Sequence, residues 1–545
     1  MKSVAKAFIL MVAIVVTATA VEAKKAPESY SNPILTGYHP DPSICRVGDD
    51  FYLINSSFEW FPGIPIHKSK DLVNWELIGY AMKDKEQCYN GNRINIFAPT
   101  IRYHDGLFYI ITTSVGSGGN FYITAKDPAG EWSKPTWLEG APGIDPSIFW
   151  DDDGKCYYIG QHHANPREWL GHNDIWIQEL DLEQGKLVGE RKNVTSGHAS
   201  NAMWTEGPHL YKIDGRYILL VAEGGTGYYH AVTIFHSENL WGPYTPDHSN
   251  PILTHRHLGI DYPVFATGHA DFVDTPNGEW WMVALGKRLK DGHTYLSRET
   301  FLVPMKLEPR KPSIREERGD YQTIIVSEGK GVIPDTHPLP KLPWTPVAPV
   351  AERDEFDGEE LALVWNFRCV PTSKWYSLEG GALKVNLRKE VAEKRAQNPS
   401  LLAQRIRDYE FQATTEMKFK SDKSNEQAGL TLYRNDKCYL MFTRKGGDVV
   451  LETRLQGEDK ELFRAPYTSD NVVLRLVSDG TDVALYYGES VKKLTRVSAT
   501  VPLTIISDLA QNFYNGPMVG IYCSSNGAES TNSATFNWFE LMGNY

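Results

Sequence analysis

The feature that most constrains the fold is a short pattern that occurs five times in this 545-residue chain. Each copy joins a tight turn, such as Asp105-Gly106, to a run of β-branched and aromatic residues, such as residues 107–110. Turns and runs of this kind are typical of β-hairpins. The five copies begin at Asp49, Asp105, Asp153, Asp214 and Asn277.

The spacing of the hairpins predicts how they are arranged. Successive copies lie roughly 50 to 60 residues apart, and most are followed by a second strand and another turn, which suits one four-stranded blade per copy. We therefore predict an all-β chain with a five-bladed β-propeller over residues 28–333. The alternative is a β-sandwich of five unrelated hairpins, but a sandwich gives no reason for the same turn to recur at a near-constant interval.

The pattern changes after a Pro-rich stretch. Residues 334–350 read as a stiff linker, since Pro restricts the backbone. Beyond it, short alternating runs at 411–419, 472–477 and 534–541 indicate strands with one buried face. We predict a two-sheet β-sandwich over residues 351–545.

The N-terminus has the pattern of a secretory signal peptide over residues 1–23. Lys2 and Lys6 precede an apolar stretch at 7–16, and small residues follow at 21–23. The apolar stretch is too short for a membrane anchor. We therefore expect a mature protein that is secreted or periplasmic.

The net charge and the composition indicate which classes of binding partner the protein can have. The formal net charge is −12, and removing Lys2, Lys6 and Glu22 with the signal changes it by −2 and +1 to −13. An acidic chain argues against nucleic acid and anionic membranes as partners. The 64 aromatic residues (15 Trp, 28 Tyr and 21 Phe) would suit stacking on sugar rings, although most belong to the core. The oligomeric state stays open.

The six cysteines are scattered singly along the chain. They are too few for a disulfide scaffold and lack the close pairs of a zinc site. A bridge between Cys45 and Cys156 and a set of buried free thiols both stay open.

Three acidic residues occur at matching places of the repeat. The tetrapeptide Asp-Pro-Ser-Ile begins at Asp41 and again at Asp145, and a third acid, Glu206, lies in the segment 204–209. The innermost strand of each propeller blade starts near the central channel, so these acids of blades 1, 3 and 4 should converge there. The alternative is that they only cap turns.

Several motifs together carry a family resemblance. The segments 39–44, 57–66, 205–211 and 222–226, with 399–405 and 516–522 in the second domain, resemble glycoside hydrolase family 43. The closest resemblance is to β-xylosidases and α-L-arabinofuranosidases that carry a C-terminal, concanavalin-like β-sandwich. It implies an inverting exo-glycosidase that releases β-D-xylose or α-L-arabinofuranose from plant cell-wall oligosaccharides and requires no cofactor.

The resemblance also implies roles for the three acids. Glycoside hydrolysis needs a carboxylic acid that protonates the leaving oxygen and a carboxylate on the opposite side of the sugar. Asp41 would be the general base and Glu206 the general acid. Asp145 would orient Glu206 and raise its pKa, because a nearby negative charge disfavours ionisation.

Other site residues follow from the same resemblance. Arg298 would bind sugar hydroxyls, and Phe58, Phe97 and Thr226 would contact the substrate. Phe97 stands where many relatives have Trp, so this aromatic surface is smaller. Tyr514 would lie on a loop of the second domain that covers the pocket. The alternatives are a surface salt bridge for Arg298 and an ordinary hairpin tip for Tyr514. Trp60 and Phe61, beside Phe58, could as easily be core packing.

His269 matches a histidine that in relatives helps to hold a cation through water. A calcium ion near His269 is therefore one expectation, and a hydrogen-bonded core histidine is the other. Outside this family, a lectin-like glycan-binding propeller and an adhesion protein are the competing classes, but neither needs the three acids. Fructan hydrolases also use three carboxylates on five blades, yet their Asn-Asp-Pro-Asn-Gly signature is missing here.

Overall fold

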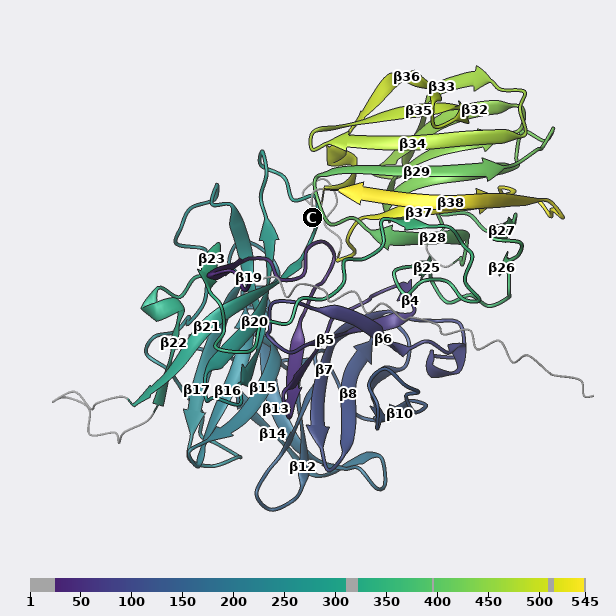
Figure 1. Cartoon of the computed structure of the whole chain (residues 1–545). Helices are drawn as coiled ribbons and strands as arrows, with labels where there is room; N and C mark the ends of the chain where they lie inside the picture. Colours follow the sequence, from purple (N-terminus) through teal and green to yellow (C-terminus); the bar gives the residue numbers. More distant parts are fainter. Residues whose placement is uncertain (1–24, 310–321, 395–396, 508–513, 544–545) are drawn as a thin grey trace, which may run out of the picture.

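The computed structural model describes residues 25–309, 322–394, 397–507 and 514–543, which form two β domains stacked on one another (Figure 1). The predicted signal peptide lies outside these residues. Within them we find no helix that is long and apolar enough to cross a membrane. The helical elements of this described part are the short 3-10 helices η1 (Lys85–Gln87), η2 (Ser327–Gly329) and η3 (Leu503–Ile506).

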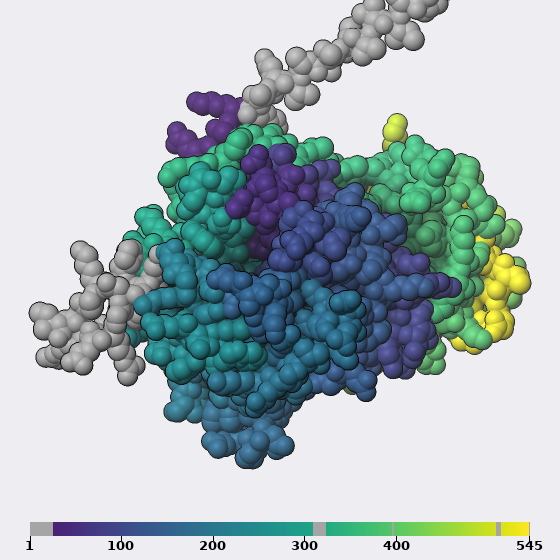
Figure 2. Space-filling view, turned by 90° about the horizontal axis from the view of Figure 1, so that it is seen from below, coloured from purple at the N-terminus to yellow at the C-terminus, as the bar shows by residue number. Residues whose placement is uncertain are grey.

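The first domain is a five-bladed β-propeller, as predicted. Each blade is a four-stranded antiparallel sheet, and Figure 2 shows the colours of the blades passing in sequence order around the domain. All five predicted turns join the first strand of a blade to its second. Blade 1 contains β2 (Ser43–Val47), β3 (Asp50–Ile54), β5 (Gly63–Ser69) and β6 (Glu76–Met82); blade 2 contains β7 (Ile96–His104), β8 (Leu107–Ser114), β9 (Gly119–Ala125) and β10 (Thr136–Trp137). Blade 3 contains β11 (Ser147–Trp150), β12 (Cys156–His163), β13 (Asn173–Asp181) and β14 (Lys186–Thr195). Blade 4 contains β15 (Glu206–Ile213), β16 (Arg216–Glu223), β17 (Ala231–Ser237) and β18 (Thr245–Pro246). Blade 5 contains β19 (Val264–Asp274), β20 (Trp280–Arg288), β21 (Glu299–Pro309) and β22 (Gln322–Val326).

The N-terminal segment holds the last blade to the first. Strand β1 (Ser29–Ser31) pairs with β23 (Thr336–Pro338), which lies in the predicted linker. The side chain of Asn32 donates to the carbonyl of Leu302 at 2.8 Å and accepts from its amide at 2.9 Å. The chain therefore runs along β21 of blade 5 before it enters blade 1.

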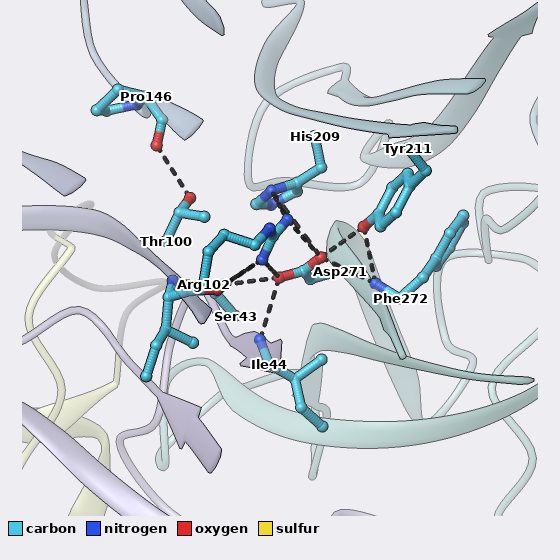
Figure 3. A network of polar contacts seen from close by, with 10 residues as sticks. Ser43, Ile44, Thr100, Arg102, Pro146, His209, Tyr211, Asp271 and Phe272 are labelled. Atoms are coloured by element: carbon cyan, nitrogen blue, oxygen red, sulfur yellow. Dashed lines mark hydrogen bonds and ion pairs between the residues drawn. The ribbon is translucent and has the colours of Figure 1, made fainter. Parts of the chain in front are cut away.

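A buried carboxylate joins the inner strands at the centre of the propeller (Figure 3). Asp271 of β19 accepts hydrogen bonds from Ser43 Oγ at 2.6 Å and from the Arg102 guanidinium at 2.8 and 3.1 Å. The Tyr211 hydroxyl also donates to it, and Arg102 contacts the His209 ring at 2.9 Å. Burial alone would raise the pKa of Asp271, but the charge of Arg102 and these hydrogen bonds hold it well below its ordinary value. One charged group thus ties together blades 1, 2, 4 and 5.

The second domain is a two-sheet β-sandwich, also as predicted. The predicted strands at 411–419, 472–477 and 534–541 correspond to neighbours in its first sheet. That sheet contains, in spatial order, β26 (Tyr376–Leu378), β27 (Leu383–Asn386), β38 (Ser533–Gly543), β29 (Glu410–Lys418), β34 (Asn471–Asp479), β35 (Asp482–Ser490) and β36 (Lys493–Pro502), with β24 (Arg353–Asp354) paired to β38. The other contains β33 (Glu458–Pro466), β32 (Asp448–Leu455), β31 (Cys438–Lys445), β30 (Gln427–Asn435), β37 (Met518–Ser524), β28 (Ser400–Arg405), β25 (Asn366–Arg368) and β4 (Trp60–Phe61).

Strand β4 comes from the propeller half of the chain. It leaves blade 1 between β3 and β5 and pairs antiparallel with β25, so that Phe61 faces Phe367 and Trp60 faces Arg368. The sequence analysis assigned these residues to the propeller alone and did not predict this shared sheet. Figure 1 places β4 directly beside β25 and β28 of the sandwich.

Apolar packing continues across this junction. One buried cluster combines Tyr38, Phe58 and Trp60 of the propeller half with sandwich residues that include Leu401 and Tyr433. Burial of this kind stabilises the contact by about 25 cal/mol per Å² of apolar surface. The two domains therefore share a core as well as a sheet. All six cysteines carry free thiols, so the bridge between Cys45 and Cys156 is not formed.

Candidate active site

The three predicted acids lie at the inner ends of blades 1, 3 and 4. Asp41 and Asp145 stand two residues ahead of β2 and β11, and Glu206 is the first residue of β15. Both aspartates have a left-handed backbone, with φ of 51° and 55°. Few residue types accept that conformation, and Asp is one of them. The sharp turn before each strand is what brings these carboxyl groups to the channel.

Asp41 is held as a charged carboxylate. Its Oδ1 accepts a hydrogen bond from Arg298 Nη1 at 2.6 Å, and its Oδ2 accepts one from Ser56 Oγ at 2.6 Å. Asp41 and Arg298 are both about 5% exposed, so solvent screens this ion pair weakly. Hydrogen bonds between ionised groups are the strong ones. The Asp41 carboxyl group is therefore fixed by two partners. The sequence analysis did not predict Ser56, and it expected Arg298 to bind sugar hydroxyls rather than a buried aspartate.

The carboxyl group of Glu206, unlike that of Asp41, lacks hydrogen-bond donors in the described part of the chain. Among the described residues neither Glu206 nor Asp145 has a hydrogen-bond donor on its carboxyl group. Burial, and after it the charge of Asp41, raise the pKa of Glu206 to about 7 against the opposing charge of Arg298. Glu206 therefore keeps its proton at pH values below about 7.

Asp145 interacts with both other acids. Its pKa is raised well above the ordinary value, first by burial and then by the charges of Glu206 and Asp41. The sequence interpretation had Asp145 raising the pKa of Glu206. In the structure burial is the largest cause for both groups. The charge of Glu206 raises the pKa of Asp145 further, whereas the charge that raises the pKa of Glu206 is that of Asp41.

Aromatic rings from both domains form one wall beside Arg298. The rings of Phe58 and Tyr514 are parallel, with centroids 6.0 Å apart, and Phe97 contacts both at 4.6 and 5.6 Å. The Arg298 guanidinium lies 5.0 Å from the Phe58 centroid, and its Nη2 donates to the Tyr514 carbonyl at 3.2 Å. The sequence placed these four residues in one site, and the structure brings them together there.

The sandwich loop that carries Tyr514 is anchored next to this wall. The side chain of Asn515 donates to Glu59 at 3.0 Å, and Glu59 pairs with Arg368 at 3.2 Å. Gly516 packs against the ring of Tyr38 so closely that a Cβ would lie 2.3 Å from it. Neither Asn515 nor Glu59 was predicted, although both are neighbours in sequence of the aromatic residues that were.

His269 lies against the start of β15. A Cβ on Gly207 would lie 2.8 Å from its ring, so only glycine fits beside Glu206 at this point. Burial lowers the pKa of His269, which keeps the imidazole neutral. In the described part of the chain no group of three or more His, Cys, Asp or Glu side chains could hold a metal ion. Calcium prefers six to eight oxygen ligands, and both carboxyl oxygens of Asp41 already accept hydrogen bonds. The residues around His269 therefore do not fit a directly bound calcium ion. An ion held through water stays a prediction.

Thr226 is the predicted residue that the described contacts do not connect to the acids. Its carbonyl accepts from Lys287 at 3.1 Å, and its hydroxyl is buried with no partner among the described residues. The preceding Gly225 packs against Trp204, two residues before Glu206. This motif therefore positions the segment ahead of Glu206, and the substrate contact of Thr226 stays a prediction.

Comparison with known proteins agrees with this arrangement. Residues 30–310 match the model of glycosyl hydrolases family 43, and residues 353–542 match the beta xylosidase C-terminal concanavalin A-like domain. The chain is 40% identical to a xylosidase/arabinosidase of Butyrivibrio fibrisolvens, covering 94% of this chain and 99% of that protein. It is 36% identical to the non-reducing end alpha-L-arabinofuranosidase BoGH43B of Bacteroides ovatus, covering 95% of each.

A solved structure has the same two-domain fold. The crystal structure of xylan beta-1,4-xylosidase from Bacillus halodurans C-125 superposes with a TM-score of 0.86 at 31% identity, covering 94% of this chain and 100% of that one. Propeller, sandwich and family matches thus span nearly the whole described chain. The protein therefore belongs to glycosyl hydrolase family 43 and is a glycoside hydrolase.

Proposed function

We propose that this protein is an exo-acting glycosidase that removes a terminal pentose from plant cell-wall oligosaccharides with inversion at the anomeric carbon. The sugar would be β-D-xylose or α-L-arabinofuranose, and the names of the relatives, which cover both activities, support this class. The pattern at residues 1–23 supports action outside the cytoplasm, as a secreted or periplasmic enzyme.

The observation that carries the proposal is the contrast between Asp41 and Glu206. A charged carboxylate fixed by Arg298 and Ser56 suits a base that takes a proton from water. A carboxyl group with its pKa raised to about 7 suits an acid that gives a proton to the leaving oxygen. Water activated by Asp41 would attack the anomeric carbon while Glu206 protonates the departing sugar, which inverts the configuration.

Asp145 and the aromatic wall take supporting roles in this proposal. Asp145 would orient Glu206, and a negative charge on Asp145 would disfavour ionisation of Glu206. Phe58, Phe97 and Tyr514 offer apolar faces to the sugar ring. Tyr514 comes from the second domain and would cover one side of the pocket, so a chain end would fit better than an internal unit, which supports exo action.

The anomer of the first product tests the mechanism. Proton NMR during hydrolysis of a β-xyloside should show α-xylose before mutarotation, and Asp41→Asn should lower the rate by roughly 10²- to 10⁴-fold. Initial β-xylose would contradict inversion, and a fully active Asp41→Asn variant would contradict the assignment of the base. Parallel assays on nitrophenyl β-xyloside, nitrophenyl α-L-arabinofuranoside and the natural oligosaccharides decide which pentose is preferred.

A further inference from the structure

A second pocket lies where the propeller and the sandwich meet. It has a volume of about 220 Å³ and is lined by His39 and His67 from the propeller and by Arg405 and Arg407 from the sandwich half. The rest of its wall is mainly apolar and includes Trp75. None of the residues that line it is an aspartate or a glutamate. The residues that line the pocket therefore include hydrogen-bond donors and positive charge but no carboxylate.

Arg405 is the central residue of this pocket. It is 9% exposed, and it uses two of its nitrogens: Nε donates to the Tyr38 carbonyl at 2.9 Å and Nη1 to Asn366 at 2.8 Å. Its Nη2 is buried and has no hydrogen-bond partner, and no carboxylate in the described part of the chain forms an ion pair with it. A buried guanidinium without a counter-charge is costly. An anion that enters the pocket would remove that cost.

The two histidines present further unused groups. Their rings lie 5.2 Å apart, edge to face, and the Nδ1 atom of each is buried without a hydrogen-bond partner. Burial, with the positive charge of Arg405, lowers the pKa of both, that of His67 to about 3. The rings are therefore neutral in the free protein, and each carries a single N–H. The ring of His39 has a hydrogen bond with Asn55, which leaves the N–H of His67 for a ligand.

We propose that this pocket binds a small oxyanion, a phosphate or a carboxylate, with Arg405 Nη2 and the Nδ1–H group of His67 as the donors. Guanidinium groups pair with such oxyanions through directed hydrogen bonds. This site is separate from the contacts of Asp41, Asp145 and Glu206, and it does not depend on which sugar is cleaved.

The position of the pocket gives the bound anion a structural role. Arg405 donates to the carbonyl of Tyr38. The backbone N–H of His39 donates to the Arg298 carbonyl at 3.0 Å, and the His39 carbonyl accepts from the Thr300 hydroxyl at 2.7 Å. This is the segment that leads directly into Asp41. A bound oxyanion would fasten it to the sandwich, so we expect binding to raise the thermal midpoint of the whole protein.

Calorimetric titration of the full chain with inorganic phosphate, and separately with acetate, tests the proposal. Chloride keeps the ionic strength constant. At least one probe should bind with a stoichiometry of one and raise the thermal midpoint. His67→Phe keeps the ring but removes its donors, and Arg405→Met removes the charge; each should weaken binding by about tenfold or more.

Arg464→Met is the matched control, since Arg464 is an exposed arginine paired with Glu461 and Asp448. It should bind the probe like the wild type. His67→Phe breaks no hydrogen bond of Arg405, so it remains decisive if Arg405→Met does not fold. The proposal is overturned if neither probe binds, or if His67→Phe binds as tightly as the wild type.

Discussion

At the scale of single residues, the two principal carboxyl groups differ through their surroundings. Asp41 receives two short hydrogen bonds, one of them from a buried arginine, whereas Glu206 is partly buried with no donor among the described residues. The same chemical group is thereby held charged in one place and favoured as the neutral acid in the other.

The raised pKa of Glu206 has a consequence for stability. Its folded-state pKa of about 7 lies above the ordinary 4.5, so between these values the unfolded chain binds fewer protons than the folded one. Stability contributed by this group is present below about pH 4.5 and is lost as the pH rises to about 7. Glu206→Gln has no charge to bury and should therefore melt higher than the wild type at pH 8, with a smaller difference at pH 4.5.

Scanning fluorimetry at the two pH values measures this difference. Glu458→Gln, at an exposed position of β33, is the control and should follow the wild type at both. A difference between Glu206→Gln and the wild type that does not change with pH would refute the prediction.

The sequence predicts residues of this site unevenly. Asp41 and Asp145 are recognisable because the same tetrapeptide opens two blades, and Arg298 and Tyr514 because they stand in family motifs. Ser56 and Asn515 belong to common residue types with no periodic signal, so their roles appear only once the chain is folded. The pKa of Glu206 is likewise a property of burial, which no local pattern reports.

At the scale of strands, the inner ring of the propeller depends on the ion pair between Arg102 and Asp271. Asp271 is fully buried and serves blades 1, 2, 4 and 5. Asp271→Asn leaves Arg102 without its counter-charge and should lower the free energy of unfolding by about 3–5 kcal/mol. Urea unfolding measures the loss.

A double variant separates charge from packing at this centre. Arg102→Met combined with Asp271→Leu removes both charges and should recover part of the lost stability. If Asp271→Asn alone is as stable as the wild type, the carboxylate does not hold the inner strands together.

A second test at this scale asks whether the loop that carries Tyr514 contacts the substrate. The Tyr514 side chain is 53% exposed, so Tyr514→Ala should leave the thermal midpoint almost unchanged. Loss of the stacked ring should raise KM roughly two- to tenfold. Steady-state kinetics on the preferred pentoside measure this effect, and Tyr514→Phe, which keeps the ring, should resemble the wild type. An unchanged KM for Tyr514→Ala would mean that the loop does not contact the substrate.

The sequence predicted strands that belong to a repeated hairpin or to a long alternating run of residues, and it missed a strand that is very short. The five hairpins share one turn chemistry, and the sandwich strands alternate over their whole length. Strand β4 has two residues, too few to show any period. Its partner β25 lies about 300 residues further along the chain, so no local signal could have linked them.

At the scale of the whole molecule, the two domains behave as one folding unit. They share a sheet through β4 and a core that contains Phe58, Trp60 and Leu401. We therefore expect calorimetry of the full protein to show one cooperative transition.

Removing the second domain provides the matching test. A fragment that ends at residue 346 exposes the edge of β4 and the apolar residues of the shared core, and it should aggregate and lack activity. Solubility and pentoside hydrolysis measure both effects. A soluble, active fragment would contradict this view.

The donated strand also limits how such enzymes can be recombined. Trp60 and Phe61 complete a sheet of the second domain and lie close in sequence to Phe58 of the aromatic wall. A chimera that exchanges C-terminal halves between relatives would therefore pair β4 of one protein with β25 of another. Transplanting residues 57–63 along with the new half would restore the match. The segments that form β4 and β25, far apart in the sequence, are therefore expected to change together.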